Sequence, residues 1–153
     1  MPFILIRDGV IEALQAEMAT QHACSPSGDM GTERGLRERS LMKLMHARVK
    51  ALNESKATDL ASLAACYGYA LAHDQLFFDA NLPTALTTIE LLLSLNGYAL
   101  SADDTTCFLG LLVVANGELS AENFASWIRK HIVPRPLSLP ERREGRINER
   151  QAL

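Results

Sequence analysis

The sequence has little cysteine, no excess of basic residues and no apolar run long enough to span a bilayer. Its three cysteines, Cys24, Cys66 and Cys107, are widely spaced and do not match a metal-ligand pattern. A net charge of −3 gives no reason to expect direct nucleic-acid binding. The longest apolar stretches are interrupted, and the one near the N-terminus lacks the basic flank of a signal peptide. We therefore expect a cytoplasmic protein that binds neither nucleic acid nor membrane.

The sequence also lacks a glycine-rich phosphate loop, internal repeats and a Ser/His/Asp constellation. What it has is hydrophobic residues, at 48% of 153 residues, which is enough for one domain with a real core. From about Pro134 the composition changes to prolines and charges with little to bury. We expect a folded domain over residues 1–132 and a charged, disordered tail over residues 133–153, either passive or able to bind a partner.

The most apolar helical pattern covers residues 82–96. Apolar side chains recur there at helical spacing, and only a narrow polar stripe interrupts them. A helix that is apolar nearly all round is buried, so this segment predicts the central helix of an all-α domain. Asn81 is expected to cap it, Pro83 suits its first turn, and Gly97 ends it.

Other helices are expected on both sides of this segment. The first follows a cap at Asp8, the second covers about residues 33–52, and a third follows a cap at Thr58 or Ser55. Two more begin after Asp103 or Asp104 and after Ser120. Residues 3–6 could form a short N-terminal strand or a flap. In the second helix the residues expected to face inward are Leu36, Leu41, Leu44, Met45, Val49 and Leu52.

The opposite face of that second helix is basic, and it predicts either a solvated surface or a docking face for an acidic partner. His22 and His46 are expected at the surface. Cys66 and Cys107 lie in apolar helical patterns and are expected in the core.

The turn before the central helix, Asp79-Ala80-Asn81, has a possible chemical role. Free amides at a helix N-terminus and the helix dipole favour an anion there. Asp79, two residues before Asn81, could hold a divalent cation beside a bound phosphate. The alternative is that Asp79 and Asn81 only cap the helix, because such turns are common.

Residues 75–86, QLFFDANLPTAL, resemble the signature of the Fic/Doc (Fido) family, His-x-Phe-x-Asp/Glu-Ala/Gly-Asn-Lys/Gly-Arg, followed by Thr-Ala in the Doc branch. The likeness continues to Asn96-Gly97-Tyr98 and is also found around residues 35–41 and 115–127, so it covers about residues 1–132. It implies a Fido-type helical bundle around the helix at residues 82–96. It also implies a toxin–antitoxin protein of the death-on-curing type, similar to transferases that move a phosphate or nucleotidyl group from a nucleoside triphosphate, with Mg²⁺, onto a protein hydroxyl.

The resemblance assigns a role to individual residues of the motif. Asp79 matches the Mg²⁺ ligand, and Phe77 matches the motif phenylalanine that packs inward. Asn81, with Ala80 and Thr84, is expected to contact the nucleotide phosphates.

The chain departs from the family pattern at the residues that do the chemistry. Gln75 stands where the family has its general-base histidine, and an amide cannot take up a proton near neutral pH. Leu82 and Pro83 replace the Lys/Gly-Arg pair and remove its positive charge. We therefore expect a catalytically impaired, Doc-like protein.

Two alternatives remain. The first is an active transferase with altered chemistry, in which Asp79 or a displaced His73 acts as the base or a different donor is used. If His73 and Gln75 share one helix, about 200° separates them, so His73 would point away from the site. The second alternative is a non-enzymatic interaction module that binds an antitoxin or a target protein.

Overall fold

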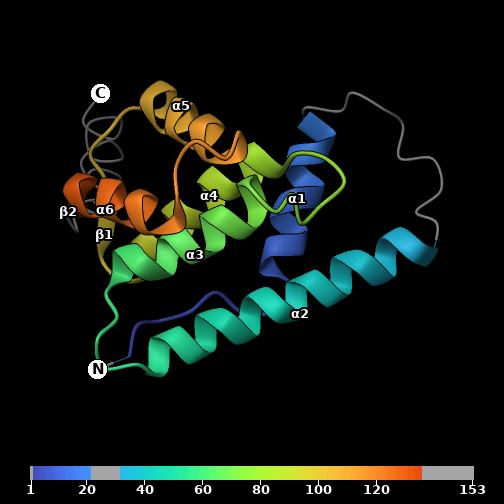
Figure 1. The fold of residues 1–153 in the computed structure, drawn as a ribbon, viewed down its shortest axis with the longest axis horizontal. Helices are drawn as coiled ribbons and strands as arrows, with labels where there is room; N and C mark the ends of the chain where they lie inside the picture. The colour runs from blue at the N-terminus through green and yellow to red at the C-terminus, as the bar shows by residue number, and fades with distance from the viewer. Residues whose placement is uncertain (1, 22–31, 136–153) are drawn as a thin grey trace, which may run out of the picture.

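The computed structural model describes residues 2–21 and 32–135, so the expectations for His22, Cys24 and the tail beyond Arg135 lie outside the described residues. The chain folds as an all-α domain with one small sheet, as expected (Figure 1). None of the helices in these two ranges is both long and apolar enough to cross a membrane. The elements are α1 (Val10–Gln21), α2 (Thr32–Glu54), α3 (Leu60–Ala72), α4 (Asn81–Leu95), β1 (Tyr98–Leu100), α5 (Asp104–Ala115), α6 (Ala121–His131) and β2 (Ile132–Pro134).

Helix α4 is the central helix, as the sequence predicts. It packs against α1, α3, α5 and β1, and Ala85, Leu92 and Leu93 on it are fully buried (Figure 1). Its apolar residues are not buried all round, since Leu95 in the last turn is 40% exposed. The helix is therefore covered by neighbours along most of its length and reaches the surface at its end.

Helix α3 lies between α4 and α6 and approaches both closely at Gly68. A Cβ atom added to Gly68 would lie 2.7 Å from Cδ1 of Ile89 and 2.8 Å from Cε2 of Phe124. The helix is capped by Asp59, and not by Thr58 or Ser55 as expected. The Asp59 carboxylate accepts from the backbone N–H of Ser62 at 2.9 Å, a contact that only the residue immediately before the helix can make.

The expected N-terminal strand does not form, and the sheet lies elsewhere. Strands β1 and β2 pair antiparallel, with Ala99 opposite Val133. Residues 3–6 instead run as an irregular segment that is held by two side-chain amides. Asn53 exchanges hydrogen bonds with the backbone N–H and C=O of Phe3, and Asn96 does the same with Ile4. These amides satisfy the backbone groups that a neighbouring strand would otherwise satisfy.

The start of α1 also differs from the expectation. The backbone N–H of Ala13 donates to the C=O of Gly9, so Gly9 occupies the cap position, with a left-handed φ of 86°. The side chain of Asp8 is 96% exposed and contacts only Nδ1 of His46, at 3.9 Å, among the described residues.

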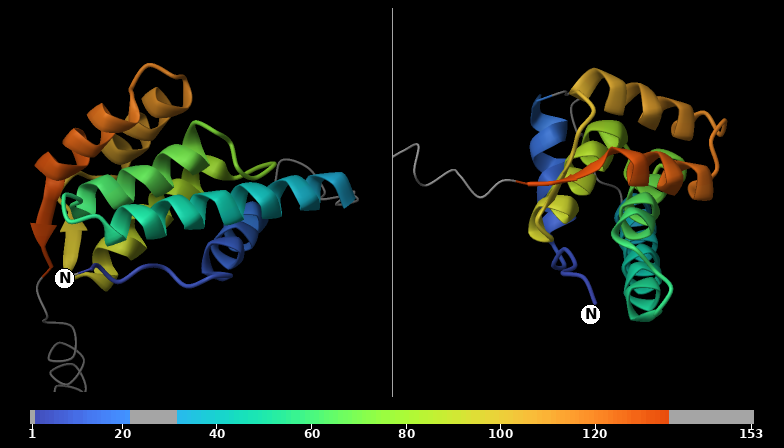
Figure 2. Two further views of the ribbon diagram at one scale, coloured as in Figure 1. Left: turned by 60° about the horizontal axis from the view of Figure 1, so that its bottom comes forward. Right: turned by 90° about the vertical axis from the view of Figure 1, so that its left-hand side faces the viewer.

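Helix α2 buries fewer residues than its pattern predicts. Leu36 and Leu44 are 57% and 48% exposed, whereas Met45 and Val49 are buried. The physical reason is that α2 packs mainly against α3, and its first turns extend beyond the rest of the molecule (Figures 1 and 2).

His46 is less exposed than the sequence predicts. Its side chain is only 19% exposed and its ring packs edge-on against Tyr67, with ring centroids 6.4 Å apart.

Candidate functional site

The motif loop connects α3 to α4 through two backbone positions in the left-handed region. Helix α3 ends at Ala72 with His73 as its C-cap, and the chain then passes through Gln75 with a φ of 47° and Ala80 with a φ of 57°. Non-glycine residues adopt such values only where surrounding contacts hold them. The loop is therefore a constrained segment, and its hydrogen bonds show what constrains it.

The main constraint is the side chain of Asn81. Its Oδ1 accepts from the backbone N–H of Phe77 at 2.9 Å, and its Nδ2 donates to the C=O of Phe77 at 2.8 Å. Asn81 is also the first residue of α4, which has no side-chain cap, so the expectation that Asn81 caps the helix is wrong. The amide turns back to close the loop. Both of its polar atoms are engaged within the motif.

One of the two phenylalanines of the loop is buried and the other is exposed to solvent. Phe77 is 4% exposed and packs inward together with Leu76, which is 1% exposed. Phe78 is 58% exposed, so its side chain does not anchor the loop in the core. Its backbone N–H instead donates to Oε1 of Glu38 on α2, at 3.1 Å. The loop is thus tied to the core through Phe77 and to α2 through Glu38.

Asp79 is tied to α1. Nε2 of Gln15 donates to Oδ1 of Asp79 at 3.0 Å and to the backbone C=O of Asp79 at 3.4 Å. Nowhere in residues 2–21 and 32–135 do three or more histidine, cysteine, aspartate or glutamate side chains gather as a metal site would require. One carboxylate with a glutamine amide already on it does not make a Mg²⁺ site by itself, because Mg²⁺ prefers six oxygen ligands. The donor set at Asp79 therefore does not fit a metal held by the protein alone.

The helix N-terminus offers few donors to a phosphate. The N–H of Thr84 is already bonded to the C=O of Ala80 at 3.1 Å, and Pro83 has no N–H. That leaves the amides of Asn81 and Leu82. The side chain of Thr84 is fully buried, and its Oγ1 has no hydrogen-bond partner among the described residues. A phosphate at this end of α4 would contact backbone and not the Thr84 hydroxyl.

Neither Gln75 nor His73 is arranged as a base beside Asp79. Gln75 is exposed, and its side chain makes no hydrogen bond within the described part of the chain. His73 and Gln75 do not share a helix, so the expected 200° separation does not apply. His73 stacks on Tyr69 with ring centroids 4.4 Å apart, and its Nδ1 lies 2.9 Å from Oδ1 of Asp74. His73 is thus engaged by α3 and its own neighbour.

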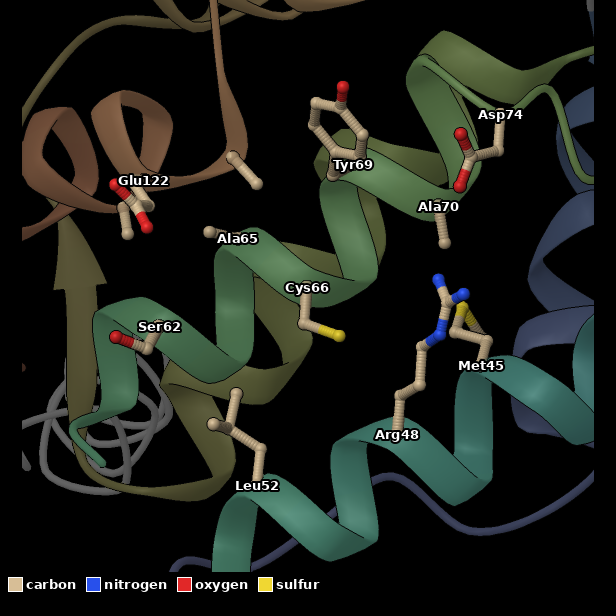
Figure 3. A pocket seen from close by; sticks show the side chains of 12 residues that line it. Met45, Arg48, Leu52, Ser62, Ala65, Cys66, Tyr69, Ala70, Asp74 and Glu122 are labelled. Atoms are coloured by element: carbon tan, nitrogen blue, oxygen red, sulfur yellow. The ribbon is translucent and has the colours of Figure 1, made fainter. Parts of the chain in front are cut away.

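A groove that the sequence analysis did not predict lies between α2, α3 and α6. It has a volume of about 380 Å³, and none of residues 75–84 lines it. Figure 3 shows side chains from the three helices facing one another across it. Cys66 lines this groove and is only partly buried, so the expectation of a core cysteine holds for Cys107, at 3% exposed, but not for Cys66. The signal in the sequence was the row of alanines on α3, Ala65 and Ala70 among them, because small side chains leave space between helices.

Two side chains near the groove and the core have shifted pKa values. Burial raises the pKa of the Cys66 thiol, with Arg48 nearby acting in the opposite direction. Burial also raises the pKa of Tyr67 to about 12. Neither group is therefore activated at neutral pH.

Comparison with known proteins adds no family to these observations. No family model matches the chain, and no curated protein gives a significant match.

Proposed function

We propose that the chain is a Doc-like protein of the toxin–antitoxin type that has lost transferase chemistry and acts in the cytoplasm by binding another protein, an antitoxin or a target. The resemblance of residues 75–86 to the Fic/Doc signature supports the family, and the all-α fold around α4 is compatible with it. The departures at Gln75, Leu82 and Pro83 support the loss of activity.

One observation carries the proposal: the side chain of Asn81 holds the loop on itself through two hydrogen bonds. Its amide makes two hydrogen bonds to the backbone of Phe77, which use Oδ1 and one N–H of Nδ2 and leave a single N–H for any phosphate contact. Gln75 cannot act as a base, because an amide does not take up a proton near neutral pH. Loss of one positioned base costs about 10²–10⁴-fold in rate, and that loss alone would make transfer slow.

The charges around the loop also oppose a nucleotide. The side chains that contact the loop from other helices are Glu38 and Gln15, and Asp79 adds a second carboxylate. A triphosphate at the loop would meet these two carboxylates, which disfavours binding.

The test is to restore the three missing groups. The variant with Gln75→His, Leu82→Lys and Pro83→Arg is compared with the wild-type chain for transfer of label from α- or γ-labelled ATP with Mg²⁺ to lysate proteins. We expect no transfer by the wild type, transfer by the restored variant, and loss of that transfer when Asp79→Ala is added. Transfer by the wild type would overturn the proposed inactivity and would favour an altered active enzyme. No transfer by a folded restored variant would count against the Doc assignment.

A further inference from the structure

Helix α5 exposes an apolar face that the rest of the described chain leaves uncovered. After Thr106 its sequence is apolar on all sides, a pattern typical of a buried helix. Only one side is covered in the structure, where Cys107, Leu111 and Val114 are buried. The other side carries four large apolar side chains that are between 36% and 58% exposed: Phe108, Leu109, Leu112 and Val113. A continuous exposed apolar face of this kind marks an interaction surface.

Acidic side chains stand at both ends of this face. Asp103 and Asp104 are exposed at the start of α5, and Glu118 is exposed directly after its end. Burial raises the pKa of Cys107, and the negative charges of Glu90, Asp104 and Asp103 raise it further. These three carboxylates therefore gather around the first turn of α5. An apolar face between acidic ends favours a partner with an apolar centre and basic flanks.

Helix α2 exposes a face with that composition. Leu36 and Leu44 are 57% and 48% exposed, and the exposed Ala47 and Ala51 follow on the same side at helical spacing. The basic residues beside this stripe are Arg37, Arg39, Lys43, Arg48 and Lys50. The acid of the same stretch, Glu38, is already bonded to the motif loop. This is the basic face for which the sequence indicates either a solvated surface or the docking of an acidic partner.

The faces of α2 and α5 match in length but cannot meet within one chain. The rise of α5 from Asp104 to Ala115 is about 17 Å, and that of α2 from Arg37 to Lys50 is about 20 Å. Helices placed side by side would therefore bring basic side chains to both acidic ends, with the leucines between them. Figures 1 and 2 show α2 and α5 on opposite sides of the molecule, with α3 and α4 between them. Only a second molecule can bring the two faces together.

We infer that α2 of one copy of this chain docks on α5 of a second copy. The contact is heterologous, because each copy uses α2 towards one neighbour and α5 towards the next, so copies add in a row. Pairing of α5 with α5 would bring acids together, and pairing of α2 with α2 would bring basic groups together, so the charges select the mixed contact. This self-association goes beyond the proposed function and does not depend on it.

Two double variants of the full-length chain separate the faces. Leu109→Gln with Leu112→Gln removes apolar surface from α5, and Leu36→Gln with Leu44→Gln removes it from α2. Glutamine is neutral and a good helix former, and all four positions are exposed, so we expect unchanged melting temperatures. Ile4→Gln is the control, because this side chain is 58% exposed and lies outside both helices.

Sedimentation equilibrium gives the mass of each protein as a function of concentration. We expect the wild type and Ile4→Gln to associate with a dissociation constant of about 0.1 mM, typical of a small, weak interface. A rise in NaCl from about 0.05 to 0.5 M should weaken this association by about three- to tenfold, because the charge pairs are exposed. Each double variant alone should remain monomeric. Their equimolar mixture should form a dimer that grows no further, because one variant supplies an intact α2 face and the other an intact α5 face.

Four results would overturn the inference. The first is a wild type that stays monomeric at about 1 mM. The second is association kept by either double variant, since one face would then pair with itself. The third is an equimolar mixture of the double variants that forms no dimer. The fourth is a wild-type association that strengthens with salt, because opposite charges would then not hold the contact.

Discussion

Asn81 illustrates how a single side chain can change the meaning of a motif. The sequence places it at the end of an acid-alanine-asparagine turn before an apolar helix, which favours a capping or phosphate-binding role. In the structure its amide closes the loop through two hydrogen bonds to the backbone of Phe77. Oδ1 accepts from the N–H at 2.9 Å, and Nδ2 donates to the C=O at 2.8 Å. The residue is a brace for the left-handed positions at Gln75 and Ala80. At the residue scale, therefore, a role in holding the loop accounts for a polar side chain at this position.

Replacement of Asn81 by alanine tests the brace. The backbone N–H and C=O of Phe77 lie beside a residue that is 4% exposed, so they would lose their partners in a poorly solvated place. We expect a loss of about 2 kcal/mol in the free energy of unfolding, measured by urea denaturation. Gln75→Ala is the control, because this side chain is exposed and the change should be within about 0.5 kcal/mol. Equal effects of the two substitutions would contradict the assigned role.

Helix packing around α3 depends on the absence of a side chain at one position. The two atoms that a Cβ at Gly68 would meet belong to Ile89 on α4 and Phe124 on α6, both nearly fully buried. The three helices therefore approach one another at this glycine, and the core of the domain is built around that contact. The sequence shows a glycine on an apolar helix face, but not which neighbours it faces.

Gly68→Ala is expected to destabilise the protein by about 1–3 kcal/mol through overpacking, despite the higher helix propensity of alanine. Gly110→Ala in α5 is the matched substitution. The nearest atom to its added Cβ is Cζ2 of Trp127 at 3.7 Å, an ordinary contact, so the gain in propensity should stabilise the protein by up to about 1 kcal/mol. Thermal unfolding of both variants measures the difference. A stabilising effect at Gly68 would show that the helices can move apart at little cost.

The cap of α3 gives the protein a specific dependence on pH. The hydrogen bond from Arg129 lowers the pKa of Asp59 from 3.8 to about 2, and burial partly opposes this. Because the folded pKa lies below the unfolded one, the stabilisation is fully present above about pH 4 and disappears as the pH falls towards 2.

The Asp59 side chain is 44% exposed, so solvent screening reduces its contribution to about 1 kcal/mol. In the Asp59→Asn variant, this part of the acid-dependent loss should be missing when urea midpoints at pH 5 and pH 2.5 are compared. A loss as large as that of the wild type would assign the pH dependence to other carboxylates.

At the scale of the whole molecule, two asparagines hold the N-terminal segment across the body. Asn53 at the end of α2 binds Phe3, and Asn96 at the end of α4 binds Ile4. The segment thereby connects elements that are distant in sequence. The expected strand at residues 3–6 was a reasonable interpretation of its apolar pattern, but side-chain amides take the place of a strand neighbour.

Replacing both Asn53 and Asn96 by alanine should speed amide hydrogen exchange at Phe3 and Ile4 and leave the amides of α4 protected. Asn123→Ala is the control, since this exposed residue contributes only its backbone N–H to the α6 cap. Unchanged exchange at Phe3 and Ile4 would mean that packing of the segment, and not the amide pair, holds it in place.

The sequence predicts those parts of the fold that follow from local rules. The apolar period of α4 and the acidic or serine caps at Asp103 and Ser120 agree with the structure. It does not predict contacts between distant segments. The β1–β2 pair, the half-buried ring of His46 and the cap at Asp59, which Arg129 reinforces, all depend on tertiary neighbours. The same applies to the motif, where Gln15 and Glu38 come from helices far away in sequence.

Calorimetric titration of the wild-type chain with ATP and Mg²⁺, repeated with Asp79→Ala, tests the central claim most directly. The claim is that the loop at residues 75–81 is braced from within and no longer serves as a transferase site. The account predicts binding no tighter than about 1 mM, or about −4 kcal/mol, and no measurable difference between the two proteins. Micromolar binding that disappears in the Asp79→Ala variant would contradict it, because a working phosphate and metal site would then survive at the N-terminus of α4.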